Sequence, residues 1–208
     1  SAARIHAIER GKDGERFLRE CRRVILPGGV VRIAVPDLER ICRLYLESLE
    51  KLREHDLPWR DRYDWMMLEL LDQSVRTRSG GEMREYLRRE EMDTEFVLSR
   101  IGGTGRDIIA ACREEARRGH REGSGTPRGL RRLRAFRRNL LLGRKERAAL
   151  ELGLFRMCGE IHQWMYDEYS LGDLLRRTGF AEVRRRSASE SGIPDWVGYG
   201  LDVDPDGM

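Results

Sequence analysis

The chain has 208 residues, of which 39% are hydrophobic and 37% are charged, and its formal net charge is +4. This length suits one ordinary domain or two small ones. The apolar and aromatic content excludes an intrinsically disordered chain, and no stretch approaches the 18 apolar residues that a membrane span needs. The first residues carry no long apolar segment typical of a signal peptide. We therefore expect a folded, cytoplasmic protein that does not enter a membrane.

The four cysteines, Cys21, Cys42, Cys112 and Cys158, lie far apart and form no Cys-x-x-Cys pair. This spacing argues against a zinc ribbon or a redox dithiol. Because free cysteine is commonly buried as a small apolar side chain, we expect structural thiols and assign no metal ligands.

The first third of the sequence predicts a helix, a strand and a second helix. Residues 13–25 repeat apolar side chains at the spacing of one helix face, and Pro27-Gly28-Gly29 ends that pattern. Residues 30–35 form a short apolar run rich in valine, which favours a strand covered on both faces. Asp37 then suits the N-cap of a helix that reaches Leu52. This order is typical of an α/β sheet.

The middle of the chain, residues 56–158, predicts helices and no convincing strand. Apolar periodicity indicates helices over residues 61–76, from Met83 onward, near residues 96–101 and over residues 108–116. Residues 119–129 are rich in Gly, Ser and Pro, which predicts an exposed loop. From Arg121 to Arg147 the chain carries ten basic and two acidic side chains, so the positive charge is concentrated there.

The last fifty residues return to an α/β pattern. Ser170 and Asp173 predict a capping box at the start of a helix, and Gly179 with Phe180 predicts its end. Residues 183–188 and 196–203 are the expected strands. We accordingly predict an α/β core over residues 1–55, an all-helical insertion over residues 56–158, and the rest of the core over residues 159–208.

Several separated segments resemble one family. They are residues 17–38, which contain Leu26-Pro27-Gly28-Gly29 before the predicted strand, residues 71–76, residues 79–83, residues 159–167, and residues 169–180. This spaced set resembles class I S-adenosylmethionine-dependent methyltransferases, and within them a bacterial group with a type-11-like domain. The ending, with residues 189–194 and 201–202, fits the same group.

The resemblance implies a partial Rossmann-like methyltransferase sheet made of the later strands, with a large all-helical insertion. It also implies S-adenosylmethionine as the cofactor and an unidentified methyl acceptor. The family's Gly-rich loop and the acidic residue ending its second strand have no counterpart here. The chain therefore resembles the carboxyl-terminal portion, and the missing amino-terminal strands are expected from a longer chain or a partner. We do not expect residues 1–208 alone to bind the cofactor normally.

His162 and Asp167 are the candidate catalytic residues. Methyl transfer needs alignment, plus a base when the acceptor is a hydroxyl or a protonated amine. An imidazole, with an ordinary pKa of about 6.5, can take up a proton near neutral pH. His162 has carboxylates nearby, Glu160 and Asp167, that could orient it. The alternative is a buried structural histidine bonded to the backbone.

Three further residues are candidates for binding the acceptor. Trp164 and Tyr166 could form aromatic walls of a pocket or hold a sulfonium, and plain core packing is the alternative. Arg76, together with the Gly80-Gly81 turn, belongs to the insertion expected to cover the acceptor side. Packing of the insertion against itself is the other reading of Arg76.

The candidate cofactor residues are His6 and Asp37. Asp37 follows the predicted strand at the edge where open α/β sheets bind ligands, although a helix N-cap also explains it. A second class of function is a non-catalytic Arg-rich module, with residues 121–147 binding RNA or another polyanion in a salt-dependent manner. Only Phe136 is available there for base stacking, so a solvated basic face is the simpler interpretation and nucleic acid is not favoured.

Overall fold

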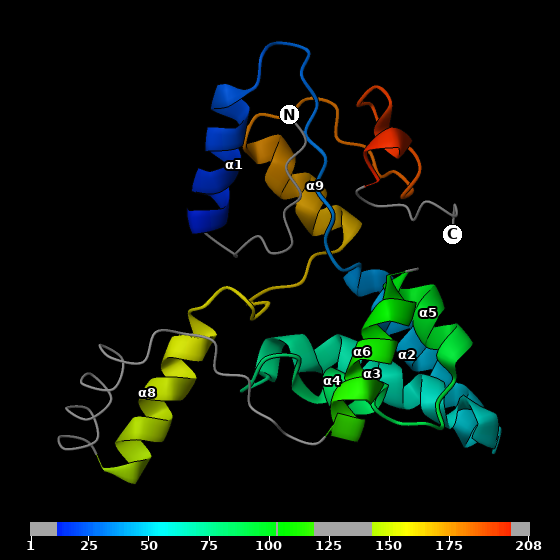
Figure 1. Ribbon diagram of the computed structural model, residues 1–208. Helices are drawn as coiled ribbons and strands as arrows, with labels where there is room; N and C mark the ends of the chain where they lie inside the picture. The colour runs from blue at the N-terminus through cyan, green and yellow to red at the C-terminus, as the bar shows by residue number, and fades with distance from the viewer. Residues whose placement is uncertain (1–11, 103, 119–142, 201–208) are drawn as a thin grey trace.

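The computed structural model describes residues 12–102, 104–118 and 143–200, and over these residues the fold is all-helical (Figure 1). The described part contains no β-strand, only one isolated parallel bridge between Asp37 and Tyr166. The predicted partial Rossmann-like sheet is therefore wrong for this part of the chain. In its place, two groups of helices pack around separate hydrophobic clusters.

The helices follow the predicted periodicities closely. Apolar spacing predicted α1, α2, α3 and α6, and these helices are confirmed. The helix starts at Met83 and before Ile101 correspond to α4 and α5, which are confirmed too. The elements in chain order are α1 (Lys12–Val24), α2 (Leu38–Arg53), the 3-10 turn η1 (Leu57–Trp59), α3 (Arg60–Val75), α4 (Gly81–Leu87), α5 (Thr94–Ile101), α6 (Gly105–Arg118), α8 (Arg144–Arg156), α9 (Glu168–Arg177) and the 3-10 turn η2 (Trp196–Tyr199).

The predicted strand at residues 30–35 is an open run of chain between α1 and α2, and Figure 1 shows it passing between them without coiling. A strand requires a neighbour that pairs with its backbone. Within the described residues, the backbones of Val30, Val31, Ile33, Ala34 and Val35 make no backbone–backbone hydrogen bond. The β-branched pattern therefore predicted the absence of helix correctly and the pairing wrongly.

The other two predicted strands are also absent from the described residues. Residues 183–188 form no ladder, and residues 196–199 form the turn η2. Side chains rather than backbone pairs hold this region. Arg32 donates to the carbonyl oxygens of Ser187 (2.9 Å) and Glu190 (2.7 Å), and its guanidinium lies 4.6 Å from the ring centroid of Trp196. The buried Trp196 indole donates to the Ala188 carbonyl oxygen at 2.9 Å.

The larger group, called here the helical cluster, consists of α2 to α6. Helix α3 joins α4 and α5, since Trp65 makes a tilted ring contact with Tyr86 of α4 and Glu69 forms a nearly buried ion pair with Arg100 of α5. Burying a large apolar side chain contributes roughly 1.5–3 kcal/mol. The buried residues are Ile41, Trp65, Met66, Tyr86, Leu87, Val97, Ile109 and Cys112.

The smaller group, called here the terminal cluster, joins α1 and α9. Leu18, Tyr166 and Leu174 are its buried residues, with Ile33 and Val35 among the side chains packed against them. The first and last α-helices of the described chain are thus brought together, as Figure 1 shows for α1 and α9. Two stretches of chain connect the clusters, the one that precedes α2 and the one that precedes α9.

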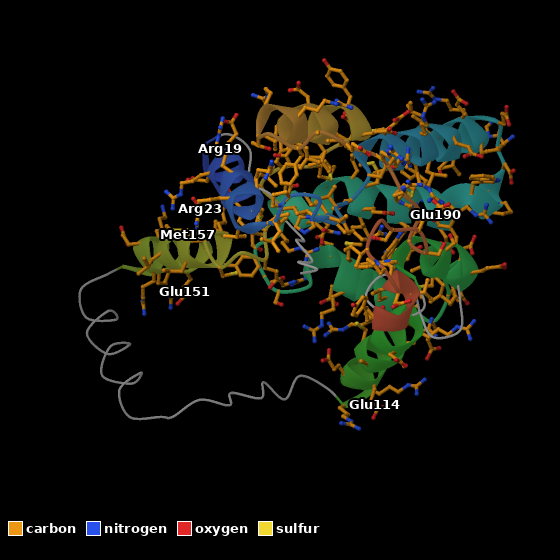
Figure 2. All side chains as sticks on the ribbon, turned by 90° about the horizontal axis from the view of Figure 1, so that it is seen from above. Arg19, Arg23, Glu114, Glu151, Met157 and Glu190 are labelled. Carbon is orange, nitrogen blue, oxygen red and sulfur yellow. The ribbon has the colours of Figure 1, made fainter. Side chains whose placement is uncertain are left out.

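Helix α8 buries none of its side chains, and in Figure 2 it extends to one side of the helical cluster, with Glu151 and Met157 labelled. Met157 is 83% exposed. The four cysteines are unpaired; Cys112 is buried and Cys158 is exposed. Over the described residues, no helix has the length and apolarity that crossing a membrane requires.

Candidate functional site

Arg76 is the centre of a charged junction between three segments of the chain. It follows α3 as the C-cap, and its side chain is only 10% exposed. Its guanidinium donates to the Asp72 carboxylate one helical turn earlier (2.8 Å) and contacts Glu160, a residue far along the chain (3.4 Å). We call Asp72, Gln73, Arg76, Gly80, Gly81, Glu160 and His162 the Arg76 junction.

Asp72 links the end of α3 to the start of α4. One carboxylate oxygen binds Arg76, and the other accepts the Glu82 N–H at 2.7 Å. Gly81 lies against this carboxylate with a φ of +55°, and a Cβ there would overlap the Asp72 oxygens. Glycine is therefore required at the turn both for its backbone conformation and for space. Asp72 itself is buried.

Glu160 brings the segment before α9 to the same turn. Its carboxylate accepts the Gly80 N–H at 2.9 Å and faces Arg76. Partial burial acts to raise the pKa of Glu160. Hydrogen bonds from Gly80, Ser79 and Arg76 outweigh that effect and hold the pKa below its ordinary value. The junction therefore contains two carboxylates and one guanidinium.

His162 joins the junction through its backbone. Its N–H donates to the Gln73 carbonyl oxygen at 3.0 Å, which ties it to the last turn of α3. The side chain is half-buried. Glu160, the carboxylate predicted near it, contacts Arg76 and the Gly80 N–H. The structure therefore brings two of the predicted site residues, His162 and Arg76, to one place.

The residues after His162 lie in three different surroundings: the surface, the helical cluster and the terminal cluster. Trp164 is 38% exposed, so it can contact a ligand. Met165 packs against the helical cluster, whereas Tyr166 is 4% exposed within the terminal cluster. Tyr166 also accepts the Leu38 N–H at its carbonyl oxygen (3.0 Å). Of the two predicted aromatic walls, Tyr166 is thus a core residue, whereas Trp164 lies partly at the surface.

Asp167 is the N-cap of α9. Its carboxylate accepts the Ser170 N–H at 2.7 Å and the Ser170 hydroxyl at 2.8 Å, and its own N–H donates to that hydroxyl oxygen. The capping box therefore begins three residues earlier than the predicted Ser170–Asp173 pair. Hydrogen bonds from the Ser170 backbone and side chain lower the pKa of Asp167. These contacts make Asp167 a structural residue, and its lowered pKa makes the carboxylate a weak base.

Asp37 is the N-cap of α2, which is the alternative to a cofactor-binding role that the sequence left open. One carboxylate oxygen accepts the Arg40 N–H (3.1 Å) and the other pairs with Arg185 (2.7 Å). These contacts show the structural role of Asp37, and its predicted cofactor role stays a prediction. The other candidate, His6, lies outside the described residues.

Two members of the junction were not predicted as Arg76 partners. Asp72 precedes Arg76 by four residues in a predicted helix, which is the spacing of a helix ion pair, so a local signal existed. The contact between Arg76 and Glu160 spans 84 residues and leaves no local signal. The basic stretch 121–147 lies largely outside the described residues, and polyanion binding there stays a prediction.

No group of three or more His, Cys, Asp or Glu side chains within the described ranges is arranged to hold a metal ion. Comparison with family models, with curated proteins and with solved structures gave no match to this chain. The methyltransferase resemblance therefore stays a prediction based on the sequence segments themselves.

Proposed function

We propose that the Arg76 junction is the methyl-acceptor side of an S-adenosylmethionine-dependent methyltransferase in the cytoplasm, with His162 as the base that takes a proton from the acceptor. One observation carries the proposal. Residues 71–76, 79–83 and 159–167 resemble the same family in sequence, and they meet at a single junction although about 80 residues separate the last from the others.

The chemistry of the junction supports the role of His162. Imidazole is the side chain whose ordinary pKa suits proton uptake near neutral pH. Two carboxylates against one guanidinium give the junction a net negative charge. The backbone bond to Gln73 fixes where the residue lies. The exposed Trp164, two residues later, offers an aromatic surface to the acceptor.

S-adenosylmethionine supplies the methyl group in this reaction class. The contacts of Asp37 are those of a helix cap and an ion-pair partner, so the proposal assigns no cofactor-binding role to the described residues. The proposal concerns the acceptor and its proton only. It depends on no sheet, since none is present in the described part of the chain.

The test uses the protein expressed from its complete gene, with tritium-labelled S-adenosylmethionine and separate metabolite, lipid, nucleic-acid and protein fractions of a cell extract. We expect one fraction to take up label. His162→Asn should lower the rate at least ~100-fold, since a positioned base contributes 10²- to 10⁴-fold. The matched control is His55→Asn, an exposed histidine after α2 with a φ of +63°, which asparagine tolerates. It should stay within about twofold of the unchanged protein.

Failure of the unchanged protein to label any fraction would overturn the proposal, and so would full activity of His162→Asn. Retention on RNA that falls with salt and disappears when Arg131, Arg132, Arg137 and Arg138 become alanine, without any labelling, would favour the Arg-rich binding module in its place.

A further inference from the structure

Glu160 fastens the segment that carries His162 to the end of the helical cluster. Its carboxylate accepts the Gly80 N–H at 2.9 Å and pairs with the Arg76 guanidinium at 3.4 Å. We propose that Glu160 is a positioning residue, which holds the His162 backbone against α3 without touching the substrate. The role deepens the proposed function and rests on it, since it concerns the placement of the proposed base.

The placement follows from two attachments close together in the chain. The Glu160 side chain binds the turn after α3, and two residues later the His162 N–H binds the Gln73 carbonyl oxygen in the last turn of the same helix. Ile161, between them, is 3% exposed. A segment held at both ends with a buried residue between them has little freedom to move. Release of the first attachment should therefore loosen the second.

The partners of Glu160 are themselves held in place. Asp72, which is 3% exposed at its side chain, binds Arg76 from the other side at 2.8 Å. The Gly80 N–H belongs to a turn in which Gly80 and Gly81 both have positive φ, and Asp72 accepts the next N–H, that of Glu82. Water is largely excluded around Arg76, which strengthens its charged hydrogen bonds. Glu160 therefore binds to a rigid site.

The first readout is hydrogen exchange of individual amides, measured in Glu160→Ala. The Gly80 N–H loses its acceptor, so its exchange should become at least ~10-fold faster. The deciding amide is His162, whose own acceptor at Gln73 is unchanged by the substitution. We expect its exchange to become at least ~10-fold faster as well. Glu39→Gln, which removes a carboxylate from an exposed ion pair with Arg43 on α2, is the control and should alter neither amide.

The second readout separates kcat from KM in the labelling assay. Misplacement of the base should lower kcat at least ~10-fold in Glu160→Ala and leave KM within about twofold. Glu160→Gln keeps an oxygen for the Gly80 N–H and should recover part of both the protection and the rate. This variant also carries the comparison if Glu160→Ala does not fold.

The outcomes distinguish the two proposals. Faster exchange at Gly80 with unchanged exchange at His162 would overturn the positioning role, whatever the activity. A kcat within twofold of the unchanged protein in Glu160→Ala would overturn it too. Faster exchange at His162 in a protein that transfers no methyl group would support the attachment by Glu160 and overturn the proposed function.

Discussion

Gly81 shows how a single residue determines whether the charged junction can form. Its φ is +55°, and a Cβ there would overlap the buried Asp72 carboxylate, which accepts the Glu82 N–H. Gly81→Ala should therefore lower the free energy of unfolding by about 3 kcal/mol. The left-handed backbone conformation contributes roughly 1–2 kcal/mol, and displacement of a buried carboxylate from its partners contributes roughly 1–3 kcal/mol. Urea unfolding followed by circular dichroism measures the loss.

Gly200 provides the matched control. Its φ is +58° in the left-handed region, close to that of Gly81, but a Cβ there would meet no described atom within 4 Å. Gly200→Ala should therefore cost only the conformational part, roughly 1–2 kcal/mol. Equal losses in the two variants would show that Asp72 does not restrict Gly81.

The sequence allowed part of this junction to be predicted. Arg76 and the Gly80-Gly81 turn were identified as points of interest, and His162 was chosen for its chemistry. The partners were harder to identify. The ion pair of Asp72 with Arg76 is local and follows helix spacing, whereas the pairing of Glu160 with Arg76 depends on how distant segments pack. Side-chain chemistry identified His162, and only the fold shows that Glu160 contacts Arg76 and the Gly80 N–H.

Helix α9 depends at its first turn on the ionised form of Asp167, which gives a pH-dependent prediction. Hydrogen bonds from Ser170 lower the pKa of Asp167 in the folded protein, relative to about 3.9 in an unfolded chain. The resulting stability is fully present above the unfolded pKa and is lost as the pH falls through the lower folded pKa. Near neutral pH, Asp167→Ala should cost about 1–2 kcal/mol.

Asp167→Asn isolates the charge, because its amide oxygen can still accept the Ser170 N–H and does not titrate. The unchanged protein should exceed this variant in stability above about pH 5, given the favourable carboxylate at a helix start. The difference should shrink as the pH falls below about 4. Urea unfolding across pH 2.5–7 measures it, and a difference that stays constant over this range would contradict the role of the ionised cap.

Elements were predictable where local spacing defines them and not where pairing defines them. The helix spacing of Leu18 and its neighbours gave α1, and Gly179 and Phe180 marked the end of α9, where Phe180 N–H bonds the Leu175 carbonyl oxygen. The valine-rich run from Val30 was correctly predicted as non-helical, but it is half-buried or exposed and not covered on both faces as predicted. A strand, however, is a property of two segments, and the described residues supply no backbone partner to this run.

At the scale of the whole molecule, the two clusters differ greatly in the size of their cores. The helical cluster has large buried side chains from α2, α3, α4, α5 and α6, whereas the terminal cluster has only Leu18, Tyr166 and Leu174. Stability rises with apolar burial, so α1 and α9 should open more readily than α3. The segment before α9 contacts the helical cluster at two places. One is the Arg76 junction at the end of α3, and the other is the bridge between Tyr166 and Asp37, the N-cap of α2.

Leu174→Ala tests whether the clusters open independently. Truncating a buried leucine typically costs 2–5 kcal/mol, so amides of α1 and α9 should lose at least ~10-fold of their protection from hydrogen exchange or lose it entirely. Amides of α3 should keep theirs, because no α3 side chain packs against Leu174. Ile41→Val, in the helical cluster, should instead act on α2 and α3. Equal loss of protection in all four helices after Leu174→Ala would mean that the described chain unfolds as one unit, and the junction would then be a part of a single core rather than a connection between two.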